Sequence, residues 1–212
     1  MPPSPSRKAR TRDEILGHAG RLFRLRGYAG TNIDDIMLAA GLTRGAFYAH
    51  FTSKEALFAE AIRRGLGLTA RLRAGDPGRA LEAYLDKDEL AQSALDCALA
   101  SLPGDVARGP LAAKLAYANQ LHVAIGELAR GRRRKLDADA TAAAILSIGA
   151  VALARACGDR TLADWLLRCA RRTAKALLKP PVSRARPRSK SRRKSAAARR
   201  PKRAARSRGG RA

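Results

Sequence analysis

Cysteine, histidine and aromatic residues are all scarce in this chain of 212 residues. It contains three cysteines, three histidines and an aromatic content of 4%. Cys97, Cys157 and Cys169 form no CxxC pair, and His122 has no partner at metal-ligand spacing, so we predict no metal site and no cofactor. Small buried thiols in a reducing cytoplasm are the simpler interpretation of the three cysteines.

Catalytic constellations are also missing. The histidines are scattered at His18, His50 and His122, and none stands in a Ser/His/Asp or Cys/His pattern. The acidic residues fall mostly on the polar faces of predicted helices. We therefore predict that this protein is not an enzyme.

Long apolar runs are absent too. The longest spans residues 142–154 (AAAILSIGAVALA), which is shorter than the roughly 18 residues that a membrane span requires. The basic start MPPSPSRKARTR is followed by no apolar segment of the secretory type. We expect a cytoplasmic protein without a membrane partner.

Positive charge is what the chain has in excess. Its formal net charge is +25, and residues 180–212 carry fourteen Lys and Arg with no acidic residue. A segment of that composition cannot bury enough apolar surface to fold, so we expect a disordered tail. The charge favours a polyanionic partner such as nucleic acid. A solubilising appendage is the alternative role for the tail.

The residues that dominate the rest of the chain are helix formers. Alanine, leucine and arginine abound and β-branched runs are absent, which predicts an all-α fold. A first helix is expected over residues 10–26, ended by Gly27, after a flexible basic arm at residues 1–8. Further helical segments are expected over residues 87–102, 109–130, 138–156 and 161–178.

Two short helices joined by a tight turn are predicted between Thr31 and Phe51. Thr31 and Asp34 have the spacing of a capping box, Gly41 supplies the turn, and Thr43 caps the next segment at residues 44–50. Ser53 is placed to cap a third helix that runs to about residue 68. This spacing is typical of a helix-turn-helix, whose second helix enters the DNA major groove.

The sequence from Thr31 to Leu57 also resembles a known family. TNIDDI, then AAGLTRGAFYAHF, then SKEAL closely resemble the signature of the TetR/AcrR family of transcriptional regulators, and the resemblance covers residues 10–60. It implies an N-terminal three-helix DNA-binding domain (residues 9–68), a larger helical ligand-binding and dimerisation domain (76–179), and the additional tail (180–212). Such a tail is not typical of the family.

The resemblance implies that the start of the recognition helix reads bases. Arg44 is the expected base-reading residue, since arginine binds guanine O6 and N7 bidentately, and Ala46 is expected to touch a thymine methyl. Phe47 and Phe51 are expected in the core. The expected DNA-contacting residues are Thr31, Thr43, Arg44, Gly45, Ala46, Tyr48, His50 and Lys54, with Arg10 and Arg12 of the N-terminal arm.

Phosphate contacts are expected from the flanks of this set. Tyr48, His50 and Lys54 are assigned to phosphates, and Thr31 to a phosphate at the N-terminus of its own helix. For the N-terminal arm, a solvated basic start is the equal alternative.

Two further sets follow from the resemblance in the larger domain. An effector pocket is expected to use Tyr84, Cys97, Tyr117, His122 and Trp165. A dimer interface is expected to use Ile145, Ile148, Val151, Trp165, Leu166 and Cys169. Ordinary core packing within one chain is the alternative for each residue of both sets.

These inferences combine into one functional prediction. We expect a homodimer that binds double-stranded DNA at a palindromic operator and represses transcription until a small-molecule effector releases it. The residues do not distinguish repression from activation and do not name the effector. The alternative is an architectural, nucleoid-associated protein whose basic tail dominates DNA binding.

Overall fold

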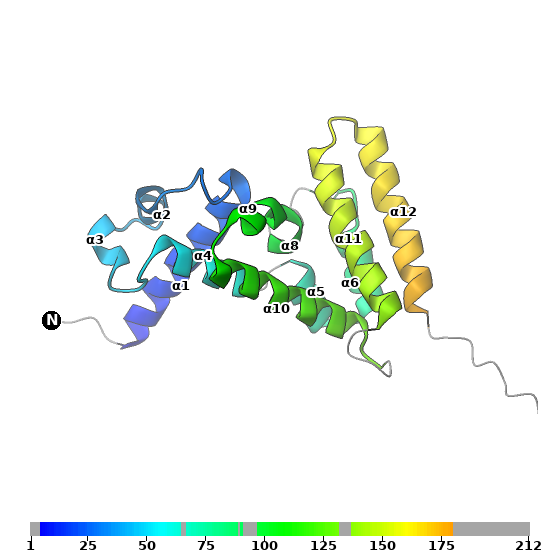
Figure 1. Cartoon of the computed structure of the whole chain (residues 1–212), viewed down its shortest axis with the longest axis horizontal. Helices are drawn as coiled ribbons and strands as arrows, with labels where there is room; N and C mark the ends of the chain where they lie inside the picture. Colours follow the sequence, from blue (N-terminus) through cyan, green and yellow to red (C-terminus); the bar gives the residue numbers. More distant parts are fainter. Residues whose placement is uncertain (1–4, 65–66, 89, 91–96, 132–136, 180–212) are drawn as a thin grey trace, which may run out of the picture. The chain divides into compact units, whose positions relative to one another are not determined.

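The computed structural model describes residues 5–64, 67–88, 90, 97–131 and 137–179, and all regular structure within these ranges is helical. The predicted all-α class is therefore confirmed (Figure 1). The contacts place the described residues in one unit that ends at Lys179. The predicted disordered tail at residues 180–212 lies outside the described residues.

The first helix, α1, spans Pro5–Arg26 and begins earlier than the sequence suggested. Residues 5–8 of the expected flexible arm are thus helical, because proline is compatible with the first turn of a helix and no glycine interrupts the residues after it. The end is as predicted. Gly27 adopts φ 75° and its N–H bonds to the carbonyl of Phe23 at 2.9 Å.

The helix-turn-helix consists of α2 (Ile33–Ala39) and α3 (Arg44–Phe47), followed by α4 (Lys54–Arg63). Gly41 makes the turn at φ 67°, where a side chain would be strained. Ser53 caps α4 as predicted, accepting from Ala56 N at 3.1 Å. Helix α3 is shorter than expected, since residues 48–50 form turns.

The middle of the chain folds into several short helices and one long one. Asp76 caps α6 by accepting from Arg79 N, and a proline occupies the first turn of this helix. The expected helix over residues 87–102 is wrong at its described end, because Cys97 is extended and a new helix begins after it. The elements are α5 (Leu68–Ala74), α6 (Pro77–Tyr84), α8 (Ala98–Ser101), α9 (Pro103–Arg108) and α10 (Leu111–Leu128).

The last two helices lie side by side and run in opposite directions (Figure 1). They are α11 (Ala138–Ala156), capped by Asp137, and α12 (Arg160–Leu178), capped by Asp159. Alanines such as Ala143, Ala150 and Ala163 are buried in this pair. By length and composition alone, α11 is also apolar enough to cross a membrane, a test that buried core helices pass as well.

Buried side chains form two clusters that do not coincide with the predicted domain boundary. One joins α5, α6, α8, α10, α11 and α12. The other contains the cores of α1 to α4 and also takes in Ala98, Leu102, Val106, Ala113 and Ala116. Thus α8, α9 and the start of α10 complete the core of the DNA-binding domain, and Tyr117 touches both clusters.

Candidate nucleic-acid interface

A rigid support holds the helix-turn-helix in place. Ile36 and Phe47 are fully buried, and Leu42 N bonds to the Met37 carbonyl at 2.9 Å across the turn. Phe51 is also buried, with its ring 5.8 Å from that of Phe47. The expected core role of both phenylalanines agrees with this burial. Side chains on the other face of α3 are therefore presented at a defined angle.

The residues assigned to DNA contacts lie in α3 and at its two ends. Arg44 and Tyr48 are exposed, as are Thr43 and Gly45, while Ala46 is half-buried. A Cβ placed on Gly45 would meet no atom within 4 Å, so this surface is open to close approach. Arg44 Nη1 donates to Asp34 Oδ2 at 2.5 Å. An arginine here can offer its remaining N–H groups to a base edge.

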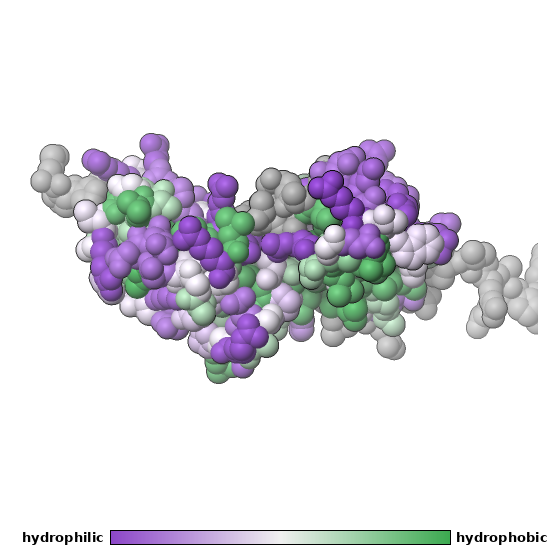
Figure 2. Space-filling view, turned by 90° about the horizontal axis from the view of Figure 1, so that it is seen from above, coloured by the Kyte–Doolittle hydropathy of each residue, from purple (hydrophilic) through white to green (hydrophobic). Residues whose placement is uncertain are grey.

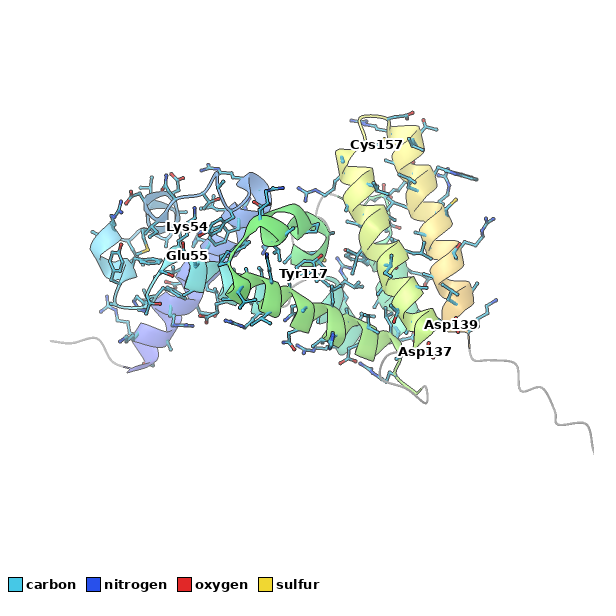
Figure 3. All side chains as sticks on the ribbon, in the orientation of Figure 1. Lys54, Glu55, Tyr117, Asp137, Asp139 and Cys157 are labelled. Atoms are coloured by element: carbon cyan, nitrogen blue, oxygen red, sulfur yellow. The ribbon has the colours of Figure 1, made fainter. Side chains whose placement is uncertain are left out.

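Lys54 is the first residue of α4 (Figure 3). Its ammonium stands 4.3 Å from the centre of the Tyr28 ring, and Tyr28 donates its hydroxyl to Glu55 at 2.9 Å. Burial lowers the pKa of Lys54. Burial and the Glu55 bond raise the pKa of Tyr28 to about 12. The aromatic ring thus orients the cation that we assign to a phosphate.

One expected DNA contact is corrected by the structure. Thr31 is fully buried, and its hydroxyl donates to the Gly27 carbonyl at 2.9 Å, so it is not free for a phosphate. The cap of α2 is Asn32, which accepts from Asp35 N at 2.7 Å. Both Thr and Asn are good N-caps, and here the threonine is used to close the preceding turn.

Arg12 is held by contacts within the chain. Its guanidinium makes a two-pronged bond to Glu60, at 2.5 and 2.6 Å, and lies 4.6 Å from the centre of the Phe51 ring. These contacts fix α1 against α4 and occupy two of the five N–H donors of a guanidinium whose side chain is 41% exposed. Arg10, in contrast, lies exposed on α1.

His50 lies half-buried near the cations of α1. Burial lowers its pKa, and the charges of Lys8 and Arg12 lower it further. Its Nδ1 atom is buried and has no hydrogen-bond partner among the described residues. A cationic surface next to the recognition helix is suited to a phosphate backbone.

The five residues expected in an effector pocket separate into two groups. Tyr84 donates to Cys97 Sγ at 3.2 Å, and Tyr117, on α10 (Figure 3), donates to the Leu99 carbonyl at 2.6 Å. Burial raises the pKa of Tyr84 well above its usual value and that of Tyr117 to about 12. His122 and Trp165 are exposed elsewhere, so they are not brought to this cluster.

The expected dimer residues lie on α11 and α12. Ile145 is 67% and Trp165 56% exposed, and Figure 2 shows hydrophobic side chains gathered at this end of the molecule. Ile148, Leu166 and Cys169 are half-buried. Val151 is a correction: it is fully buried in the chain's own core, whereas Ile145 is exposed.

Two polar contacts that join the DNA-binding helices to the rest were not predicted. Asp105 of α9 accepts from Tyr28 N at 2.8 Å, and Gln120 of α10 donates to the Arg63 carbonyl at 2.7 Å. Each bond joins residues more than fifty positions apart, so no local sequence pattern announces it. In the described ranges, no group of acidic, cysteine and histidine side chains is placed to hold a metal.

The exposed face of α3, its rigid support and the cations around it define a helix-turn-helix DNA-binding domain. Residues 15–61 match the family described as bacterial regulatory proteins, tetR family. Over these residues the chain carries a DNA-binding domain of the TetR family.

Curated proteins and solved structures that are similar to this chain agree with this assignment. The transcriptional repressor KstR2 of Mycolicibacterium smegmatis is 42% identical over 62 residues, 29% of this chain and 30% of that protein. The regulator AcrR of Shigella flexneri is 50% identical over 50 residues, 24% and 23% of the two chains. The chain thus spans less than a third of these curated relatives. A TetR-family regulator from Cytophaga hutchinsonii shares the fold, with TM-score 0.62, 23% identity, and coverage of 83% and 98%.

Proposed function

We propose that this protein is a transcriptional repressor that binds a palindromic operator as a homodimer and is released by a small molecule. The observation that carries the proposal is the exposed pair of Arg44, the first residue of the well-supported recognition helix, and Tyr48, which caps its end, within a TetR-family domain. Arg44 reads a guanine and Tyr48 binds a phosphate. The name of the relative KstR2 supports repression rather than activation.

Homodimerisation follows from the outer surface of α11 and α12. Ile145, Leu153, Leu162 and Trp165 leave between 45% and 67% of their surfaces exposed. Exposed apolar residues gathered on one face mark an interaction site. A second copy of the same face, related by a two-fold axis, buries them and places two recognition helices on successive half-sites about 34 Å apart.

The effector is assigned to the helices around Tyr84, Cys97 and Tyr117. Thr69 Oγ1 and Gln120 Oε1 are buried and have no hydrogen-bond partner within the described part of the chain. Buried polar atoms are almost always paired, so these two are available to a ligand that donates hydrogen bonds. Gln120 also holds the carbonyl that ends α4, which connects this region to the DNA-binding helices.

The route from effector to DNA passes through α9. Tyr117 binds Leu99 of α8, and Asp105 of the next helix binds the backbone of Tyr28. Tyr28 in turn orients Lys54 at the DNA face. A ligand that prefers a shifted position of α8 and α9 will change the angle of the recognition helix, to the extent of its differential affinity.

The tail at residues 180–212 adds affinity that does not depend on sequence. Each phosphate neutralised contributes about −0.9 to the slope of log affinity against log salt on duplex DNA. The tail therefore raises occupancy and association rate, while α3 selects the site. On this basis the protein is cytoplasmic and associated with the nucleoid.

Footprinting tests the proposal with the full chain and with a 1–179 variant at about 150 mM salt. We expect both forms to protect the same palindromic site, with a shallower salt slope for the truncated form. Genome-wide mapping of bound sites then identifies the regulated genes. Arg44→Ala should lose about 1–3 kcal/mol on the cognate site and relax one base pair per half-site.

The fourteen cations of the tail favour a second candidate, an architectural protein that coats DNA. In that case the full chain protects DNA uniformly, and the 1–179 form shows no sequence preference. Those two results together would replace the repressor proposal.

A further inference from the structure

A carboxylate lies directly beside the side chain that opens the recognition helix. Asp34 Oδ2 accepts from Arg44 Nη1 at 2.5 Å. The two side chains are 55% and 61% exposed, so both belong to the outer surface of the helix-turn-helix. Asp34 comes from the first turn of α2 and Arg44 from α3, so the pair bridges the turn at Gly41.

Neither helix capping nor folding stability accounts for this pair. Asn32, not Asp34, caps α2. An exposed ion pair adds little to the free energy of folding, because water solvates both charges. Asp34 also places a negative charge on the face that approaches DNA phosphates, which opposes binding to any sequence. The position of Asp34 on this face is therefore better explained by its bond to Arg44.

We infer that Asp34 determines specificity by holding the Arg44 guanidinium in the orientation that reads a guanine. The inference rests on the base-reading role proposed for Arg44. A guanidinium has five N–H donors, so the bond from Nη1 leaves others free for guanine O6 and N7. Asp34 is a positioning residue, since it acts through Arg44.

The gain in specificity is entropic. A free arginine has many rotamers and can turn to phosphates and to several bases. Asp34 has already restricted those rotamers, so the correct base meets a side chain that is ordered in advance. The wrong base finds donors that cannot turn toward its acceptors.

Two effects of opposite sign follow from this arrangement. Asp34→Ala should reduce the preference for the base pair read by Arg44 by about three- to tenfold, which is part of the 5- to 150-fold that a bidentate contact supplies. The same change should raise affinity for random-sequence DNA by about two- to fivefold, because a negative charge leaves the DNA-facing surface.

The neighbouring residue provides a matched control. Asp35 lies in the same first turn of α2, carries the same charge, and forms an ion pair with Arg26 at 3.5 Å. Asp35→Ala removes an equal charge from the same helix terminus but leaves the Arg44 pair intact. It should raise affinity for random DNA without changing the preferred base.

The test is selection of bound sites from a random duplex library, using the full chain and its Asp34→Ala, Asp34→Asn, Asp35→Ala and Arg44→Ala variants. We expect Asp34→Ala and Arg44→Ala to relax the same base pair, Asp34→Asn to relax it less, and Asp35→Ala to leave it unchanged. Circular dichroism checks that each variant is folded. If Asp34→Ala does not fold, the isosteric Asp34→Asn takes its place in the comparison.

Three results would overturn the inference: an unchanged preference in Asp34→Ala, an equal loss in Asp35→Ala, or a change at a different base pair from that of Arg44→Ala. Failure of the proposed function looks different. In that case the unmodified chain selects no sequence, or Arg44→Ala leaves the selected sequence as it was.

Discussion

The bond between Asp105 and Tyr28 offers a direct measure of how strongly α9 is attached to the DNA-binding helices. Asp105 Oδ1 accepts from Tyr28 N at 2.8 Å, and the carboxylate covers Gly27 so closely that a Cβ there would lie 2.9 Å from the oxygen. Asp105→Ala leaves the partly buried N–H unpaired. The free energy of unfolding should fall by about 1–2 kcal/mol.

Urea unfolding followed by circular dichroism measures this change, with an unaltered m-value showing that the same structure unfolds. Asp105→Asn is the control, because its amide oxygen can still accept the bond and should keep the loss within about 0.5 kcal/mol. The reasoning is refuted if Asp105→Ala unfolds at the wild-type midpoint. Equal losses in Ala and Asn would show that the charge matters and not the acceptor.

Three other perturbations test the remaining features. Ile145→Glu or Trp165→Glu should shift the protein to monomers in sedimentation velocity, because a buried unpaired charge opposes the interface. Leu111→Glu, a control at an exposed residue of α10, should leave the dimer unchanged. His50 has a lowered pKa, so its neutral form is favoured in the folded state and stability is lost as pH falls through its ordinary value of 6.5. The difference between the unfolding midpoints at about pH 7.5 and about pH 5.5 should therefore be smaller in His50→Gln than in the unmodified chain. Tyr48→Phe should weaken binding to all DNA sequences equally in competition assays, and an altered base preference would contradict its phosphate role.

Much of the helix-turn-helix was predictable because its signals are local. Gly27 and Gly41 are needed where the backbone turns to positive φ, and Ser53 caps α4 by accepting from the N–H of the residue three positions ahead. The assignment of Thr31 as the cap of α2 was wrong by one residue. Asn32 was also a suitable cap, and the choice between them depended on the Gly27 carbonyl, which only the folded turn brings to Thr31.

Partners of charged and aromatic side chains were not predictable in the same way. Arg12 and Trp165 were each given a role without knowledge of their surroundings. Arg12 is bonded to Glu60, and Trp165 is 56% exposed while Tyr84 and Cys97 are buried. Nothing near either residue in the sequence identifies such partners. The core of the DNA-binding domain was not predictable from local sequence either. Helices α8, α9 and the start of α10 contribute buried residues to it, whereas the sequence assigned this core to residues 9–68.

The sequence by itself determined the all-helical class, the position of the turn at Gly41 and the family, because helix periods, caps and turn glycines act over three or four residues. Only the tertiary structure decided which acidic side chains the arginines of the DNA-binding domain bind. It joined Arg44 to Asp34 across a turn, Arg12 to Glu60 across two helices, and α9 to Tyr28 across 77 positions. Those pairings depend on how distant segments pack, and packing is a property of the whole buried core.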